Sequence, residues 1–150
     1  MDHAATTTLD RQALSATTHC LTGCAIGEVL GLVISTALGW HDLPSVVLAI
    51  VLAFVFGYAL TIRSLRASGI PFRRAGRLAI ASDTLSIVTM EIVDTAIVVA
   101  IPGAMAAGLL TGLFWGSLAV SLVIAGIVAF PVNRWLIARG KGHAVLHGTH

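Results

Sequence analysis

The sequence predicts an all-α protein, a bundle of four transmembrane helices with its N- and C-termini on the cytoplasmic side. Of its 150 residues, 57% are hydrophobic and only 11% are charged, whereas a soluble domain is about half apolar and a quarter charged. Four apolar runs reach the length of about 20 residues that a helix needs to cross a bilayer. An even number of spans also puts all nine Lys and Arg residues on one side of the membrane.

Turn-forming residues separate the four runs. Gly39 to Pro44 divides the first run from the second, and Ile101 to Gly103 divides the third from the fourth. A polar, arginine-rich stretch lies between the second and third runs. The predicted helices cover about residues 16–38, 44–62, 78–101 and 104–130, within a membrane domain over residues 16–135.

The basic residues determine the predicted orientation. Five arginines lie within residues 63–77, the other four basic residues lie towards the two termini, and the two opposite connections contain none. Cytoplasmic loops carry an excess of Lys and Arg, so both termini and the central connection are predicted to be cytoplasmic. Residues 1–15 are polar and are predicted to form a mobile N-terminal tail. Residues 136–150 are predicted to be a cytoplasmic tail with basic residues and His143, His147 and His150.

The first apolar run carries residues that a simple membrane anchor lacks. On a helix with about 100° per residue, Cys20, Cys24 and Glu28 share one face, and His19 comes just before them. Two cysteines four residues apart on a helix do not suit the geometry of a disulfide, so both are predicted to be thiols. Small residues let helices approach closely in lipid, and glycines at intervals of four predict such a packing surface beside this face. These glycines are Gly23, Gly27 and Gly31.

The third run carries three carboxylates. Asp83, Met90 and Asp94 fall within one narrow sector of the helical wheel, and Glu91 lies beside it. Each carboxylate costs about 2.5 to 3.5 kcal/mol within a membrane helix, so these side chains must face the interior of the bundle or water. The first and third helices run in the same direction. Their polar residues are therefore predicted to match in depth and to form a ladder of sites between the two helices.

The atoms offered by this ladder favour a transition-metal ion. Thiolate and thioether ligands suit Cu(I), whereas imidazole and carboxylate suit zinc, iron, manganese or nickel. We therefore predict binding and transport of a transition metal, with copper slightly favoured. The predicted metal-binding residues are His19, Cys20, Cys24, Glu28, Asp83, Met90, Glu91 and Asp94.

The same residues allow other interpretations. Cysteine and methionine also fill apolar cores, and buried carboxylates also serve as structural hydrogen-bonding groups. Buried carboxylates can instead conduct protons or monovalent cations. A third alternative is a subunit that binds another membrane protein and transports nothing. An enzyme is not predicted, because His19 and Cys20 point about 100° apart on a helix, and P-loop, GxGxxG and nucleophile-elbow motifs are missing from the sequence.

The remaining helices are predicted to serve packing. The second and fourth runs have no charged residue and contain small residues at intervals of four, which favour close helix contacts and self-association into a homo-oligomer. The predicted partners are therefore the lipid bilayer, further copies of the chain and a metal ion, and no nucleic acid. The glycine ridge predicted in the fourth helix consists of Gly108, Gly112 and Gly116.

Three short motifs carry a resemblance to a known family. They are His19-Cys20-x-x-Gly23-Cys24-x-x-Gly27-Glu28, Met90-Glu91-x-x-Asp94 and Pro131-Val-Asn-Arg-Trp135. The sequence resembles a bacterial integral membrane family known as domain of unknown function 4396. This resemblance covers nearly the whole chain and implies a four-helix integral membrane domain, but it implies no activity. We predict a multi-pass protein of the bacterial inner membrane.

Overall fold

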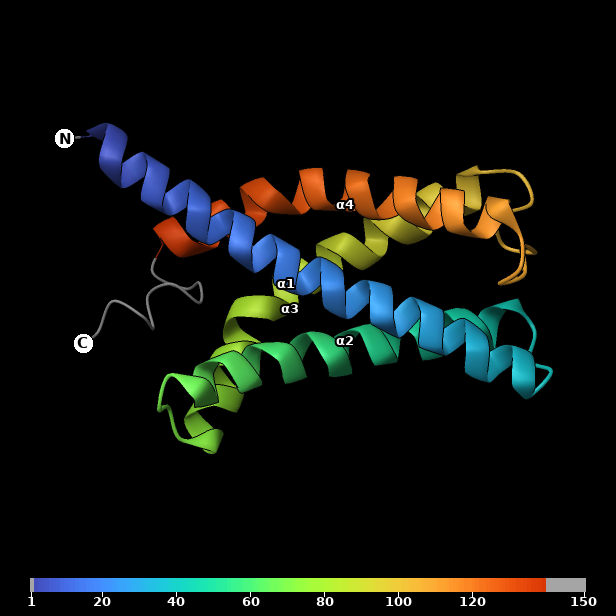
Figure 1. Cartoon of the computed structure of the whole chain (residues 1–150), viewed down its shortest axis with the longest axis horizontal. Coiled ribbons are helices and arrows are strands. Elements are labelled where there is room, and N and C mark those ends of the chain that lie inside the picture. Colours follow the sequence, from blue (N-terminus) through green and yellow to red (C-terminus); the bar gives the residue numbers. More distant parts are fainter. Residues whose placement is uncertain (1, 140–150) are drawn as a thin grey trace.

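Four long helices make up most of residues 2–139, the part of the chain that the computed structural model describes (Figure 1). No strand occurs within this range, so the prediction of an all-α, four-helix protein is confirmed. The helices are α1 (Asp2–Ala37), α2 (Asp42–Ala67), α3 (Phe72–Ala100) and α4 (Gly112–Ala138).

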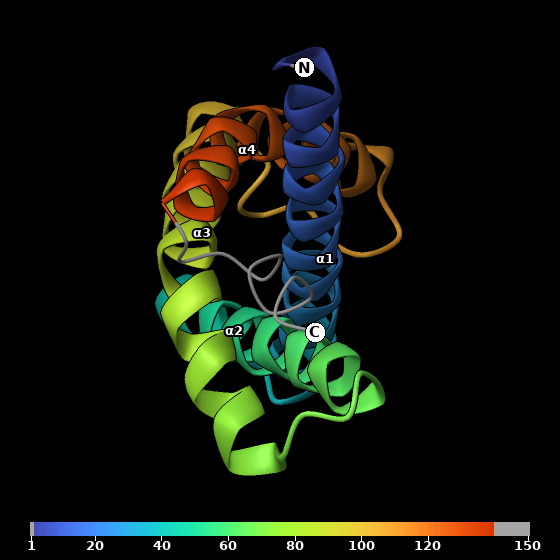
Figure 2. The ribbon, with the colours of Figure 1, turned by 90° about the vertical axis from the view of Figure 1, so that its left-hand side faces the viewer.

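The helices run alternately up and down the bundle. The connections over residues 38–41 and 101–111 lie at one end, which we call the distal end (Figure 1). The start of α1, the end of α4 and the connection between α2 and α3 lie at the opposite, proximal end. In the end view, α1 and α3 lie on opposite sides of the bundle, with α2 and α4 between them (Figure 2). The polar faces predicted for the first and third helices can therefore meet at the centre.

Glycines bring α1 against α2. A Cβ atom added to Gly27 would lie 2.3 Å from the backbone nitrogen of Ala53, and one added to Gly23 would lie 2.7 Å from the backbone of Gly57. Gly31 approaches the Cα atom of Ala49 in the same way. The three glycines predicted to pack the first helix thus lie where side chains would force the two backbones apart.

Three of the helices, α1, α2 and α4, are long and apolar enough to cross a membrane. The outward faces of these helices carry large exposed aliphatic side chains, such as Val51 on α2 and Ile127 on α4. Helix α3 has 29 residues, but its hydropathy is lowered by three carboxylates and by arginines in its first turns. Its three carboxylates are buried by the other helices, whereas the arginines are exposed. These features identify a membrane protein.

Helix α1 begins earlier than predicted. Residues 2–15, which were predicted to form a tail, continue the helix into the proximal end of the bundle. There Ala13 and Ala16 pack against Ile137 of α4, and the Nε atom of Arg134 lies 2.6 Å from Oδ1 of Asp10. The low hydropathy of this segment does not prevent a helix, because a polar helix can pack through a few alanines.

Helix α4 begins and ends later than predicted. Thr111 caps its N-terminus by accepting a hydrogen bond from the backbone nitrogen of Phe114 at 3.3 Å, so residues 104–111 precede the helix. Pro131 does not end α4. Transmembrane helices tolerate proline when neighbouring groups satisfy the backbone, and Asn133 holds the next turn by donating to the Thr17 hydroxyl at 2.9 Å.

The glycine ridge predicted in the fourth helix does not form. Gly108 lies in the connection before α4, and Cβ atoms added to Gly108, Gly112 or Gly116 would meet no atom within 4 Å. The prediction of this ridge was wrong because it placed the start of the fourth helix at residue 104, whereas α4 begins at Gly112. The same interval of four does apply to the neighbouring positions Ser117, Ser121, Ala125 and Ala129, all of which are buried.

The connection between α2 and α3 is shorter than the predicted basic loop. It covers residues 68–71, and Gly69 supplies its turn with a φ of +88°. The five arginines of this region lie on the last turns of α2 and the first turns of α3. The two helices therefore extend beyond the apolar runs that identified them.

At the proximal contact between α1 and α4, the exposed ion pair is expected to contribute little to the free energy of unfolding. Arg134 and Asp10 remain 41% and 47% exposed, so replacing Arg134 with Gln should cost less than about 1 kcal/mol. Replacing Asn133 with Ala should cost about 1 kcal/mol or more, because a buried hydrogen bond is lost. Thermal unfolding of the two variants in detergent would measure both effects, and a larger loss for the Arg134 variant would contradict this assignment.

Candidate functional site

Three sulfur atoms are buried at the centre of the bundle. Cys20, Cys24 and Met90 are 2%, 1% and 1% exposed, and they belong to one cluster of buried side chains. Both cysteines are free thiols. We call these three residues the sulfur set. Helix α1 supplies two of its members and α3 the third, as the helical spacing predicted.

The polar residues of α1 and α3 pair at successive depths. The Cys20 thiol interacts with Asp83 and Ser86, and the Cys24 thiol interacts with the Glu91 carboxyl group. The Glu28 carboxyl group lies beside that of Asp94 and also interacts with Glu91. The structure therefore brings together the ladder that was predicted from the sequence.

Three carboxyl groups of this ladder have unsatisfied oxygens. We call Glu28, Glu91 and Asp94 the carboxylate set. One oxygen of each is shielded from solvent and has no hydrogen-bond partner among the described residues. Glu91 and Asp94 are each only 7% exposed. Buried polar atoms normally have a partner, so this arrangement favours a bound proton or cation.

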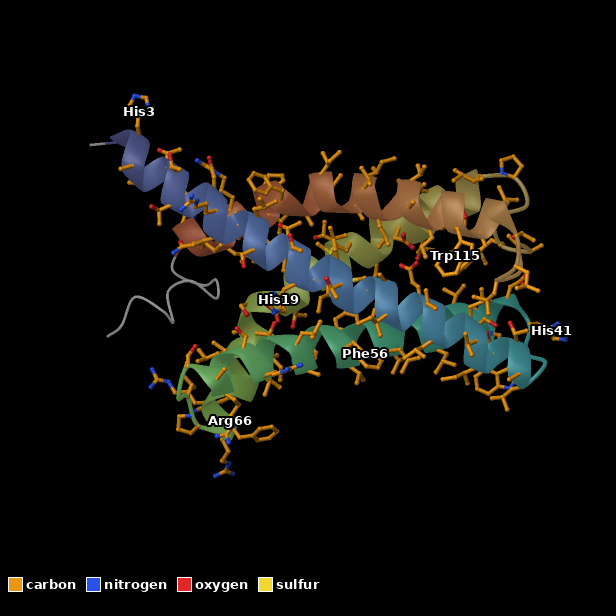
Figure 3. The ribbon with its side chains drawn as sticks, in the orientation of Figure 1. His3, His19, His41, Phe56, Arg66 and Trp115 are labelled. Atoms are coloured by element: carbon orange, nitrogen blue, oxygen red, sulfur yellow. The ribbon has the colours of Figure 1, made fainter. Side chains whose placement is uncertain are left out.

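A cavity of about 400 Å³ opens beside the carboxylate set. It extends from the centre of the bundle to the distal end, which His41 marks in Figure 3. All four helices contribute to its wall, and residues 104–108 of the connection before α4 cover one side. The carboxylate set thus has a route towards the distal surface, whereas the sulfur set lies deeper among packed side chains.

Two other predicted ligands lie apart from the cavity. Asp83 accepts a hydrogen bond from Ser82 at 2.8 Å and is 1% exposed. His19 is half-buried on α1 (Figure 3). Within residues 2–139, no three His, Cys, Asp or Glu side chains form a group able to hold a metal ion. The histidines at positions 143, 147 and 150 lie outside the described residues.

Several residues of this region were not predicted from the sequence. Ser121 of α4 interacts with Asp94, and Ser86 lies beside Cys20. Trp40 and Asp42 line the distal part of the cavity. A signal for Ser121 was present, because serines at intervals of four in an otherwise apolar helix mark a face that is turned inward.

Comparisons with known proteins identify the family. No curated protein and no solved structure matched the chain. A family model matches residues 10–142, a range that includes most of α1 and all of α2, α3 and α4. Both the ladder and the cavity lie within the matched range. The chain belongs to the family described as Domain of unknown function (DUF4396).

Proposed function

We propose that this protein binds a transition-metal ion within the membrane and moves it through the bundle, with Cu(I) favoured. The observation that supports this function is the position of the buried sulfur set directly beside the carboxylate set. Two thiols and a thioether suit Cu(I). Carboxylates beside an open cavity attract cations, and thiols release their protons when they bind a metal.

The proposed location is the bacterial inner membrane, with several spans and cytoplasmic termini. The arginines at the ends of α2 and α3 and near the end of α4 all lie towards the proximal end. Because positive residues concentrate on the cytoplasmic side, the proximal end is placed there. The cavity then opens on the opposite side of the membrane, and an ion that passes the carboxylate set reaches the sulfur set next.

Titration of the purified chain with Cu(I), under reducing conditions and against a coloured Cu(I) chelator, would test the proposal. We expect one tightly bound ion per chain. Replacing Cys24 with Ala or Met90 with Leu should weaken binding by at least about tenfold, which is the scale of effect known for supporting residues of metal sites. Val33 lies on the exposed side of α1, away from the sulfur set and the cavity, so Val33→Ala is the control and should bind normally. Unchanged stoichiometry and affinity in the Cys24 variant would reject the proposal.

Proton conduction is a second candidate function. The observation that favours it is that thiol and carboxyl groups follow one another along the ladder, and chains of protonatable groups relay protons in membrane proteins. Replacing both Cys20 and Cys24 with Ala separates the two candidates. Proton flux into liposomes through the carboxylate set should survive this double change, whereas metal flux should not.

A further inference from the structure

The wall of the cavity is acidic, and the described residues that form it include no basic side chain. Four of the seven Asp and Glu residues of the chain line it, and none of the described lining residues is Lys, Arg or His. The carboxylate set lies at its inner end and Asp42 at its distal end. Glu91 and Asp94 are more than nine-tenths buried and keep oxygens without a partner. The cavity therefore favours a positively charged occupant.

The hydroxyl groups of the wall add further acceptors. Ser35, Ser45 and Ser117 each donate their proton to a backbone oxygen of their own chain segment, at 3.2, 2.8 and 3.0 Å. Their oxygens can then only accept hydrogen bonds from a ligand. An ammonium group carries three N–H donors and no acceptor. It therefore complements a wall that offers acceptors.

The size and the apolar parts of the wall favour an organic cation. A volume of about 400 Å³ is many times the roughly 30 Å³ that one water molecule occupies in the liquid, so a bare ion would fill little of it. Aliphatic and aromatic side chains, including Leu32, Val46 and Phe114, line the cavity between its acidic ends. Such surfaces suit methylene groups.

The two acidic ends are well separated along the bundle. Gly31 of α1 packs against Ala49 of α2. Glu28 lies three residues from Gly31 towards the proximal end, and Asp42 lies seven residues from Ala49 towards the distal end. At about 1.5 Å per residue, the ten residues correspond to a separation of about 15 Å. An elongated ligand with positive charge at both ends fits this arrangement.

We propose that the cavity binds a linear aliphatic polyamine, with one terminal ammonium group at the carboxylate set and the other near Asp42 and Trp40. An indole ring attracts cations, so Trp40 adds to the recognition of the distal ammonium group. This site does not use the sulfur set. A bound polyamine would occupy the route by which a metal ion reaches the carboxylate set.

Calorimetric titration of the full chain in detergent, with spermidine as the probe, tests this inference. We expect one spermidine per chain and at least about tenfold weaker binding of propylamine and of Mg²⁺ at equal ionic strength. Asp42→Asn and Glu28→Gln should each weaken spermidine binding by about tenfold, because each removes a charge-assisted hydrogen bond. Asp10→Asn, the same chemical change at the proximal end, is the control and should bind normally.

Three outcomes would overturn the inference. They are no spermidine binding by the unaltered chain, equal binding of Mg²⁺, and normal binding by both the Asp42 and the Glu28 variants. Asp42 is exposed, so its replacement leaves the packing of the bundle intact. The variant with Cys20 and Cys24 both replaced by Ala should still bind spermidine. This result would show that the polyamine site does not need the sulfur set, so the polyamine inference can hold even if the metal proposal fails.

Discussion

Replacing Gly27 with alanine is expected to lower the midpoint of thermal unfolding by about 10 °C, from an overpacking cost of about 3 kcal/mol. The added Cβ atom would lie 2.3 Å from the backbone nitrogen of Ala53 and 2.6 Å from its Cα atom. Because these are backbone atoms, no change of side-chain rotamer relieves the clash. Helices α1 and α2 must separate, which removes the close packing that holds helices together in lipid.

Gly116→Ala is the matched control for this prediction. Gly116 also lies within a helix, but a Cβ atom there meets nothing within 4 Å. The midpoint should stay the same or rise slightly, because alanine restricts the unfolded chain more than glycine does. Both midpoints can be measured by circular dichroism in the same detergent. Equal midpoints for the two variants would show that the contact between Gly27 and Ala53 does not hold α1 in place.

The same contact also positions the candidate site. Glu28 follows Gly27 directly, and Cys24 follows Gly23, which packs against Gly57. On a helix, adjacent residues point about 100° apart. The surface that fixes α1 against α2 therefore turns the residues of the ladder towards α3. A change at Gly27 should disturb cation binding as well as stability.

The ladder could be predicted from the sequence because helical geometry determines which residues share a face. Residues at i, i+4 and i+8 share a face in any helix, and a carboxylate within a membrane has no low-energy position except the interior. Pairing between α1 and α3 needed only the further assumption that the two helices run in the same direction. For this reason the pairs formed by Cys24 with Glu91 and by Glu28 with Asp94 appear in the structure as expected.

The cavity could not be predicted in this way. It depends on residues 104–108, whose apolar sequence resembles the start of a helix but which lie before the cap at Thr111. It also depends on the divergence of α1 from α4 towards the distal end (Figure 1), which no local sequence pattern encodes. The proximal extension of α1 could not be predicted for a related reason, because it is stabilised by contacts of Ala13 and Ala16 with Ile137 of α4.

The carboxylate set is expected to control ion passage. Replacing both Glu28 with Gln and Asp94 with Asn should reduce Cu(I) flux into liposomes by about 100-fold, the upper range for residues that support a metal site. The amide groups preserve shape and hydrogen bonding, but they cannot carry the negative charge that draws a cation from the cavity. Flux can be followed with a Cu(I) chelator sealed inside the liposomes.

The same double variant distinguishes a transport site from a structural pair. If the two facing carboxyl groups only held α1 against α3 and α4, amides of nearly equal size would keep those contacts, and both folding and flux would survive. If they form the route for the ion, the variant should fold with an unchanged unfolding midpoint and lose flux. Asp10→Asn, which changes a carboxylate far from the cavity, should lose neither. Full flux in the double variant would show that the pair of Glu28 and Asp94 serves packing alone, because the ion would then cross without the negative charge of these two groups.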